Sequence, residues 1–401
     1  MRPVAEQMEV LRRGVDALLP EGELERRLAE GRPLRVKLGV DPTAPQVHIG
    51  WAVVLRKLRQ FQELGHTAVL IVGDFTARVG DPSEQSETRS RLSAQAVRGF
   101  AESCLEGLRR VLLPEPLEIR YNADWLASMS MEEVLELAST FTVARLLDRE
   151  DFANRYRAGR PISLLEFVYP LLQGMDSAAV RADVELGGAD QLWNLLAARD
   201  IQERQGQRSQ VVMTVPLLVG TDGMRKMSQS LGNYVAIDDS PEEMFGKVMS
   251  IPDEAMPQYF LLATELPGPE LEEITTGLET GRLHPAETKR RLGREIVRLH
   301  HDEEAARQAE AHFDRLFVSR EAPEHVAEFP LPAGDPLWLP ALLRDAGLVS
   351  STSEARRLID QGAVELDGEV LTGQEVARDR LGEAVVQVGK RRFVKFVKGA
   401  E

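Results

Sequence analysis

Residues 34–73 carry the pattern that most constrains the fold of this chain. Residues 34–40 (LRVKLGV) form a short apolar run, which is followed by an Asp-Pro-Thr turn and by an amphipathic stretch that closes on Gly65. A second apolar run, TAVLIVG, covers residues 67–73. Strand, helix and strand in this order predict a right-handed βαβ unit and hence a parallel sheet. Ligands of such sheets bind at the carboxyl ends of the strands, where DPTAPQVHIG and GDFTARVGDPSE both fall.

The remaining patterns predict further domains. Residues 92–160 are mostly helical in pattern, and a strand-like run at 210–220 follows a helix at 189–205. We therefore predict an α/β catalytic domain with a helical insertion over 1–235 and an α-helical domain over 236–325. A proline-containing linker is expected at 326–335. Residues 336–401 predict a small α+β domain with two short helices and a hairpin around Asp367-Gly368.

The charge of the chain is unevenly distributed. The 401 residues carry a formal net charge of −15, which disfavours nucleic-acid binding as a whole. Residues 336–401 contain ten Lys/Arg and ten Asp/Glu, so residues 1–335 hold the entire negative excess. Basic residues gather at the end of the neutral segment, at Lys390, Arg391, Arg392, Lys395 and Lys398. This asymmetry favours a small nucleic-acid-binding module there.

Cysteine content and hydropathy indicate the compartment. Cys104 is the single cysteine, so no intramolecular disulfide is possible, and no Cys/His cluster around it predicts a metal site. No signal-peptide pattern and no run of about 18 uncharged apolar residues occurs. We expect a cytoplasmic protein without a membrane segment.

Two short motifs fall where a nucleotide could bind. His48 and Gly50 lie between a predicted strand and a helix N-terminus, where backbone N–H groups and the helix dipole favour a phosphate. Lys226 and Ser228 belong to RKMSQS, on a loop after the last predicted strand, from which the ammonium could reach a developing pyrophosphate charge. Alone, the histidine is more often a capping residue, and the loop more often a solvated surface segment.

Together the motifs are specific. HIGW and KMSQS resemble the HIGH and KMSKS signatures of the class I aminoacyl-tRNA synthetases. The stretches DPTAPQVHIG, GDFTARVGDPS, YPLLQGMDS, ADVELGGADQ and PLLVGTDG resemble the bacterial tyrosyl-tRNA synthetases, and ARRLIDQGAVELDG is similar to an S4 RNA-binding domain. The resemblance covers essentially the whole chain. It implies a Rossmann-like catalytic domain, an anticodon-recognition domain and an S4-like domain.

The resemblance implies a tyrosine site. Asp81, Tyr169 and Gln173 would bind the substrate ammonium, Asp176 would accept the phenol hydrogen bond, and Gln191 would face the carboxylate. Independently of the family, Tyr169, Gln173 and Asp176 have the spacing i, i+4 and i+7 of one helix face. The alternative for that face is a buried tyrosine beside a helix cap, but its buried polar groups would then need other partners.

The resemblance also implies an ATP site and an RNA surface. His48 and Lys226 are the expected catalytic residues, which would stabilise the phosphate charge with Mg²⁺ assisting. The expected ATP-binding residues are Asp41, Gly50, Gly187, Gly188, Asp190, Lys226 and Ser228. The glycine pair would let adenosine approach and Asp190 would hold its ribose, although a tight turn is an alternative. The expected RNA-binding residues are Arg356, Arg357, Lys390, Arg391 and Arg392.

Several residues depart from the family pattern on the phosphate side. Trp51 stands where the family has the second histidine of HIGH, and Gln229 stands where it has the second lysine of KMSKS. The family loop GDPSGRSKTR reads GDPSEQSETR, which places Glu84, Gln85 and Glu87 at positions of glycine, arginine and lysine, while Arg89 is retained. Smaller departures are Met175 for tyrosine and Ala189 for threonine. The loss of several cations could slow adenylate formation by orders of magnitude.

Three functions follow from these observations. The leading hypothesis is a homodimeric tyrosine–tRNA ligase that uses L-tyrosine, ATP and tRNA(Tyr). The first alternative is a divergent synthetase relative with weak or altered activity, serving resistance, a modified amino acid or regulation. The second is a non-catalytic RNA-binding protein, which would have no need of Asp176.

Overall fold

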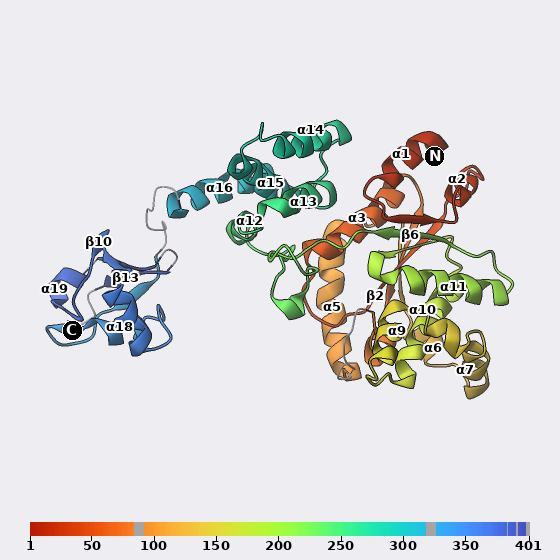
Figure 1. Ribbon diagram of the computed structural model, residues 1–401, viewed down its shortest axis with the longest axis horizontal. Helices are drawn as coiled ribbons and strands as arrows, with labels where there is room; N and C mark the ends of the chain where they lie inside the picture. Colours follow the sequence, from red (N-terminus) through yellow and green to blue (C-terminus); the bar gives the residue numbers. More distant parts are fainter. Residues whose placement is uncertain (84–91, 318–325, 383, 390–391, 398–401) are drawn as a thin grey trace. The chain divides into compact units, whose positions relative to one another are not determined.

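The computed structural model describes residues 1–83, 92–317, 326–382, 384–389 and 392–397. The chain forms two compact units, Met1–His300 and His301–Glu401 (Figure 1). The domain boundaries expected at 235, 325 and 335 stay predictions. Each unit is described below by itself.

The first unit is built on a six-stranded sheet that confirms the predicted α/β fold. The strands are β1 Ala17–Leu19, β2 Arg35–Val40, β3 Thr67–Val72, β4 Leu117–Tyr121, β5 Val184–Gly188 and β6 Val211–Val215, in the order β1-β6-β5-β2-β3-β4. β2 to β6 are parallel to their neighbours, and β1 pairs antiparallel with β6 at one edge. β2 and β3 are adjacent, with Val36 opposite Ala68 in register, so the predicted strand–helix–strand unit is present.

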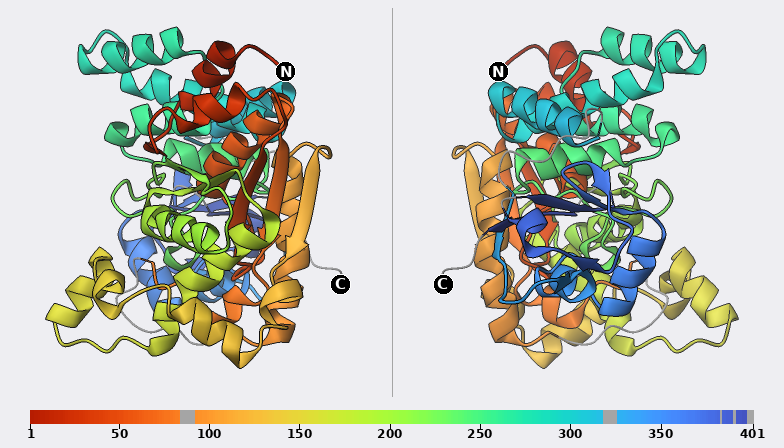
Figure 2. Two further views of the ribbon diagram at one scale, coloured as in Figure 1. Left: turned by 90° about the vertical axis from the view of Figure 1, so that its right-hand side faces the viewer. Right: turned by 90° about the vertical axis from the view of Figure 1, so that its left-hand side faces the viewer.

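Helices cover both faces of the sheet. α3 (Ile49–Glu63) and α5 (Ala94–Val111) lie on one side, and α10 (Leu164–Val180) and α11 (Leu192–Arg204) lie on the other (Figure 1, Figure 2). α10 begins with a capping box between Ser163 and Glu166, and its core-facing residues include Leu171, Leu172 and Ala178. The other helices here are α1 Val4–Arg12, α2 Glu23–Leu28, α4 Thr76–Val79, α6 Ala123–Leu126, α7 Met131–Ala138, α8 Val143–Leu146 and α9 Glu150–Arg157.

β4 differs from the sequence expectation, because it lies in the segment that was predicted to be mostly helical. Its residues, LEIRY, alternate charge with apolar side chains and are all partly or fully exposed. Glu118 accepts two hydrogen bonds from Arg35 of β2, at 2.6 and 2.8 Å. The alternation of LEIRY is a local strand signal that the helical expectation overlooked, whereas its pairing with the edge strand β3, about 50 residues away, has no local signal.

The segment after β6 is helical, as expected. Its helices are α12 Pro241–Met249, α13 Met256–Ala263, α14 Gly268–Glu279 and α15 Pro285–His300, and it contains the short 3₁₀ turns η2 Gln229–Leu231 and η3 Asp253–Ala255. A further 3₁₀ turn, η1 Ala189–Gln191, lies earlier, between β5 and α11. α12 packs on α15, where Gly293 allows close approach because a Cβ there would lie 2.8 Å from Phe245 Cε2. α13 contacts α3, so these helices belong to the first unit.

The second unit has its own sheet and apolar core. Its five-stranded sheet has the order β10-β9-β12-β13-β7, and β8 pairs with β11. The strands are β7 Glu328–Pro330, β8 Leu337–Trp338, β9 Val364–Leu366, β10 Glu369–Val370, β11 Glu375–Val376, β12 Val385–Val388 and β13 Arg392–Val397, and the helices are α16 Glu303–Phe317, α17 Leu339–Asp345, α18 Thr352–Asp360 and α19 Arg378–Leu381. The predicted two helices and hairpin are present, with positive φ at Asp367 and Gly368. β7 lies inside the segment expected to be a linker.

Candidate active site

Polar side chains gather where the parallel strands end. Asp41 directly follows β2, Thr76 lies just beyond β3, Asn122 directly follows β4, and Asp190 and Gln191 follow β5. The carboxyl edge of an open parallel sheet is the usual ligand site of such folds. The structure therefore brings the predicted residues of the DPT, GDPS and GGADQ stretches to one edge of the sheet.

A chain of hydrogen bonds links Asp41 to Asp176. The Tyr169 hydroxyl donates to Asp41 Oδ2 at 3.0 Å, and the Thr76 hydroxyl donates to Asp41 Oδ1 at 2.7 Å. Asn122 Nδ2 donates to Thr76 Oγ1 at 2.9 Å and to Asp176 Oδ2 at 3.1 Å. Desolvation, with the nearby carboxylates, raises the pKa of Asp41 to about 7. Neutral donors thus hold two carboxylates, Asp41 beside Tyr169 of α10 and Asp176 of α10 itself.

Asp176 is the most deeply placed acid of this group. It is buried, and Trp125 Nε1 donates to its Oδ1 at 2.9 Å. Desolvation raises the pKa of Asp176 to about 6, while the charge of Lys37 and the bonds from Asn122 and Trp125 oppose that rise. Each carboxylate oxygen has two acceptor positions, so Asp176 retains capacity to accept a further hydroxyl.

A second network surrounds Asp81. Gln191 Nε2 donates to Asp81 Oδ2 at 2.8 Å and to Ser83 Oγ at 3.2 Å. Asn194 Nδ2 donates to Gln191 Oε1 at 3.1 Å and to Gln173 Oε1 at 3.2 Å. The expected ammonium and carboxylate residues are therefore connected. These side chains hydrogen-bond to one another, so the polar face of α10 has partners within the protein.

A buried lysine lies below this face and was not singled out from the sequence. Lys37 of β2 donates to Glu185 Oε1 at 2.7 Å, to Ser177 Oγ at 2.8 Å and to the Gln173 carbonyl at 2.9 Å. Gln210 Nε2 and the Ser177 hydroxyl donate to the other Glu185 oxygen. A lysine inside the apolar run LRVKLGV is the available signal, because charged residues are rarely buried unless paired. Asn122, Trp125 and Asn194 were missed as well, since none belongs to a quoted motif, and Thr76 was not singled out although it lies within GDFTARVGDPS.

His48 is the N-cap residue of α3 and is almost fully buried. Its ring lies 5.9 Å from that of Trp51, edge to face, and 6.3 Å from that of Tyr234. Desolvation, followed by the charge of Lys226, lowers the pKa of His48 to about 4. The imidazole is thus neutral at pH 7, and its Nδ1 has no protein hydrogen-bond partner. Trp51 and Tyr234 are thus aromatic neighbours of this imidazole.

The glycines of the predicted nucleotide edge lie against protein atoms. A Cβ at Gly50 would lie 3.0 Å from His48 Nδ1, so this glycine leaves room for the imidazole. A Cβ at Gly188 would lie 2.6 Å from Asp190 Oδ1 and 2.7 Å from Leu217 Cδ2, and one at Gly187 would lie 3.0 Å from Gln191 Cβ. Both glycines therefore permit the tight turn that presents Asp190 and Gln191.

The 220–233 loop contacts both sides of the nucleotide edge. Lys226 Nζ lies 3.2 Å from Asp190 Oδ2. The amide of Ser228 donates to Asn233 Oδ1 at 2.9 Å. Gln229 Nε2 donates to the carbonyl oxygen of Gln46, on the segment that leads to His48. The KMSQS motif therefore contacts the segment that precedes HIGW. The positions Glu84, Gln85, Glu87 and Arg89 lie outside the described residues.

The predicted RNA-binding arginines belong to the second unit. The Arg356 guanidinium lies over the Trp338 ring, 5.1 Å from its centroid, and Arg357 is exposed on the same helix. Arg392 Nη1 donates to the Leu348 carbonyl and to Glu354 Oε1. Lys390 and Arg391 lie outside the described residues.

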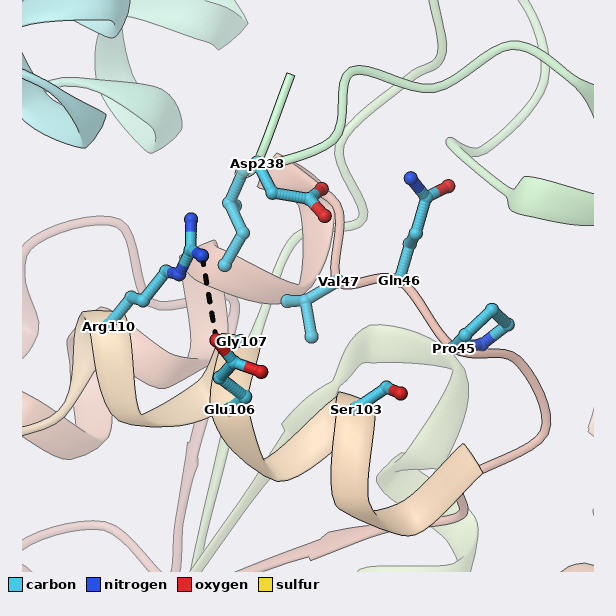
Figure 3. Close-up of a pocket in the computed structure, with 9 residues that line it drawn as sticks. Pro45, Gln46, Val47, Ser103, Glu106, Gly107, Arg110 and Asp238 are labelled. Carbon is cyan, nitrogen blue, oxygen red and sulfur yellow. Dashed lines mark ion pairs between the residues drawn. The ribbon is translucent and has the colours of Figure 1, made fainter. Parts of the chain in front are cut away.

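A cavity of about 270 Å³ adjoins the segment before His48 (Figure 3). α5 supplies one wall, including the ion pair between Glu106 and Arg110, whose atoms are 3.8 Å apart. The lining residues are Pro45, Gln46, Val47, Ser103, Glu106, Gly107, Arg110, Ile237 and Asp238. None of the predicted substrate residues lines this cavity. Within the described ranges, no cluster of three or more His, Cys, Asp or Glu could hold a metal ion, and no helix is long and apolar enough to cross a membrane.

The sequence matches two protein-family models and several tyrosine–tRNA ligases. The family model described as tRNA synthetases class I (W and Y) matches residues 29–318, and the S4 domain model matches residues 337–377. A tyrosine–tRNA ligase of Moorella thermoacetica is 50% identical over 397 residues, covering 98% of this chain and 96% of that protein. The tyrosine–tRNA ligase of Thermotoga maritima is 47% identical over 394 residues, covering 98% of each.

Solved structures share the fold. The tyrosyl-tRNA synthetase of Archaeoglobus fulgidus, complexed with L-tyrosine, has a TM-score of 0.63 at 23% identity, covering 77% of this chain and all of that one. A truncated mitochondrial tyrosyl-tRNA synthetase of Aspergillus nidulans has a TM-score of 0.63 at 22% identity, covering 79% of this chain and 95% of that one. At these identities the likeness concerns the architecture of the chain.

Proposed function

We propose a tyrosine–tRNA ligase activity for this chain, because it belongs to the family of class I tRNA synthetases (W and Y). The observation that carries the choice of tyrosine is the buried Asp176 carboxylate, held by Asn122 and Trp125 beside the polar face of α10. Phenylalanine has no hydroxyl group, so its binding would leave the Asp176 carboxylate without a hydrogen-bond donor from the substrate. For tyrosyl-tRNA synthetase, the standard example of this effect, that rejection is about 10⁵.

The other substrate contacts follow from the same networks. We assign the substrate ammonium to Asp81, Tyr169 and Gln173, and the carboxylate to Gln191. Support comes from the hydrogen bonds that now join Asp81, Gln191 and Gln173 through Asn194, since a bound amino acid would replace them with its own charged groups. Asp41 would orient Tyr169 through its 3.0 Å hydrogen bond.

The reaction would have two steps. The tyrosine carboxylate attacks the α-phosphorus of ATP, which forms tyrosyl-adenylate and releases pyrophosphate. A hydroxyl of the terminal tRNA adenosine then attacks the acyl carbon and releases AMP. No enzyme nucleophile is needed, so positioning and charge stabilisation carry the catalysis. Mg²⁺ would arrive with ATP, held by phosphate oxygens and water.

We assign the phosphate side to His48 and Lys226. The imidazole is neutral, so it would act as a hydrogen-bond donor, and its unpartnered Nδ1 marks available capacity. Lys226 would carry the positive charge for the leaving pyrophosphate, after moving from Asp190, which would hold the ribose. Asp41, Gly50, Gly187, Gly188 and Ser228 complete the proposed nucleotide edge.

Tyrosine-dependent ATP/pyrophosphate exchange, followed by charging of tRNA(Tyr), tests the proposal. We expect exchange with tyrosine and a much lower rate with phenylalanine. Asp176→Ala should abolish the preference, whereas Asp124→Ala, at an exposed acid of α6, should leave it intact. Absence of exchange with every aromatic amino acid would refute the ligase assignment.

A divergent relative with weak charging is the second candidate function. The observation that favours it is the contact between Gln229 and the Gln46 carbonyl, where the resembling enzymes have a lysine. Restoring the cation in Gln229→Lys should raise the exchange rate about tenfold or more, as expected for one charge-assisted hydrogen bond. Gln361→Lys, an exposed position of the second unit, is the charge-matched control. An unchanged rate in Gln229→Lys would show that this cation does not limit the reaction.

We further propose a cytoplasmic homodimer that binds tRNA partly through its S4 domain. Five exposed apolar side chains come from four consecutive helices, and a second copy would cover them. They are Met131 and Leu135 of α7, Val143 of α8, Tyr156 of α9 and Leu164 of α10. Arg356, Arg357 and Arg392, with Lys390 and Arg391, are the proposed RNA contacts.

A further inference from the structure

The ammonium of Lys37 is fully engaged inside the protein. Its side chain is entirely buried, as is that of Glu185, and its hydrogen bonds reach Glu185, Ser177 and the Gln173 carbonyl. Three acceptors match the three ammonium protons. Two of those acceptors, Gln173 and Ser177, belong to the turn of α10 that also carries Asp176. Lys37 therefore joins the sheet to the helix segment that presents the phenol acceptor.

Packing alone does not account for a charged pair at this place. β2 is a central strand, and its neighbours Val36 and Leu38 are buried apolar residues. Replacing a buried ion pair by apolar side chains of similar volume is often neutral or stabilising, because both charges lose their hydration. The lysine and the glutamate lie on adjacent strands beneath the proposed substrate site. Their charges therefore point to a function other than stabilising the fold.

The charges around Asp176 have one dominant sign. Tyr169 lies on the same helix, Asp41 follows β2 and interacts with Asp176 through its charge, and Glu185 faces it from β5. Asn122 and Trp125, from the β4–α6 side, are neutral donors, and Arg120 lies over the Trp125 ring, 5.6 Å from its centroid. Lys37 is the cation that acts on Asp176 among the groups described for it. Lys37 therefore opposes both the burial of Asp176 and the repulsion by the neighbouring acids.

We propose that Lys37 is a positioning residue for amino-acid selection, whose buried ammonium keeps Asp176 ionised as an acceptor for the substrate hydroxyl, with Glu185 fixing the ammonium in place. This inference rests on the proposed tyrosine ligase function. An ionised carboxylate accepts a phenol hydrogen bond about twice as strongly as a neutral acceptor. Selection of tyrosine at neutral pH then depends on a residue that need not touch the substrate.

The charge mechanism predicts opposite effects for the two members of the pair. Loss of the cation in Lys37→Met raises the pKa of Asp176 further, so tyrosine affinity begins to fall at a higher pH. Loss of the anion in Glu185→Gln leaves the ammonium unopposed and lowers that pKa, so affinity persists to a lower pH. A nearby charge shifts the pKa of a carboxyl group by about one unit or more. A purely structural role would weaken binding in both variants without moving the midpoints apart.

The experiment measures the dissociation constants of tyrosine and phenylalanine by calorimetry between pH 5 and pH 8.5. In the wild type, tyrosine affinity should fall as pH decreases through the pKa of Asp176, which lies at about 6. The midpoint should move up by about one unit in Lys37→Met and down in Glu185→Gln. At pH 6, one unit below its own midpoint, Lys37→Met should show about fivefold less preference for tyrosine over phenylalanine than the wild type, and it should match the wild type at pH 8.5.

Two controls isolate the cause, and Glu185→Gln provides a second test of the charge mechanism. Lys57→Met removes another buried lysine, which donates to the Leu11 and Arg13 carbonyls, and should leave the midpoint unmoved. The double variant Lys37→Met/Glu185→Gln prevents Glu185 from titrating, so an upward shift of its midpoint relative to that of Glu185→Gln alone belongs to Lys37. If Lys37→Met does not fold, the downward shift of Glu185→Gln still tests the charge mechanism.

The outcomes separate this inference from the function on which it rests. A wild type that binds no tyrosine would overturn the proposed function. A wild type that binds tyrosine selectively, together with folded variants whose midpoints stay in place or move in the same direction, would overturn the role of Lys37.

Discussion

At the scale of single residues, an acid of the proposed site and an acid outside it affect folding stability in opposite ways. Asp41 is half-buried, and desolvation raises its pKa to about 7. Ionised Asp41 therefore lowers the stability of the folded state, which an exposed ionised aspartate would not do. The opposite holds for Asp183, because bonds from Arg32 and the Arg35 amide outweigh burial and keep its pKa below the ordinary value. The pKa shifts of Asp41 and Asp183 thus have opposite directions, and the raised pKa of Asp41 is the kind of shift found at functional sites.

This contrast predicts opposite pH dependences for two aspartate variants. A raised carboxyl pKa makes the folded state hold its proton between about pH 4 and pH 7, so stability falls as pH rises through that window. Asp41→Asn should therefore raise the free energy of unfolding at pH 8 by up to about 4 kcal/mol, less where water screens the half-buried carboxylate, and change little at pH 4. Asp183→Asn should lower stability at pH 8. Urea unfolding at both pH values measures this, and equal effects for the two variants would contradict it.

At the scale of elements, the contact between α10 and α11 positions the substrate side chains. A Cβ at Gly174 would lie 2.4 Å from Ile201 Cδ1 and 3.1 Å from the Ala198 backbone, so glycine sets the separation of the helices. α10 carries Tyr169, Gln173 and Asp176, and α11 carries Asn194, whose amide bridges to Gln173. A small displacement of either helix would therefore disturb the tyrosine site.

Gly174→Ala should cost about 1–3 kcal/mol of stability and reduce tyrosine affinity. Ile201→Val removes the clashing methyl group and should restore part of both losses in the double variant. Gly99→Ala is the matched control, because a Cβ at this helical position meets no atom within 4 Å and should stabilise the protein by about 0.5–1 kcal/mol. Thermal unfolding and tyrosine binding report the outcome. Full affinity in Gly174→Ala would show that the helix contact does not position the site.

At the scale of the whole molecule, the proposed dimer face consists of the exposed apolar side chains of α7 to α10. Leu164, which begins α10, is 81% exposed, and an aspartate at this helix N-terminus would satisfy the helix dipole. Leu164→Asp should therefore fold normally and shift the protein towards the monomer. Val370→Asp changes an exposed residue on the hairpin of the second unit and should leave the molar mass of the particle in solution unchanged. Light scattering across a dilution series measures both, and a monomeric wild type would refute the dimer.

The predictable part of this protein follows from local periodicity and from quoted motifs. Residues 34–73 predicted β2, α3 and β3 because apolar runs, helical amphipathicity and turn residues are signals that act over a few positions. The spacing of Tyr169, Gln173 and Asp176 predicted one helix face for the same reason. Asp367-Gly368 predicted its hairpin, since a tight turn needs residues that accept positive φ.

Tertiary structure decided the features whose partners are distant in sequence. Lys37 meets Glu185 across 148 positions, Asp81 meets Gln191 across 110, and Gln229 meets the Gln46 carbonyl across 183. Each contact depends on which strands become neighbours, and β4 likewise formed because an edge was open. The sequence by itself determined the α/β class, the family motifs and the residues available for chemistry. Folding decided which charges face one another, because burial and distance set the cost of ionisation.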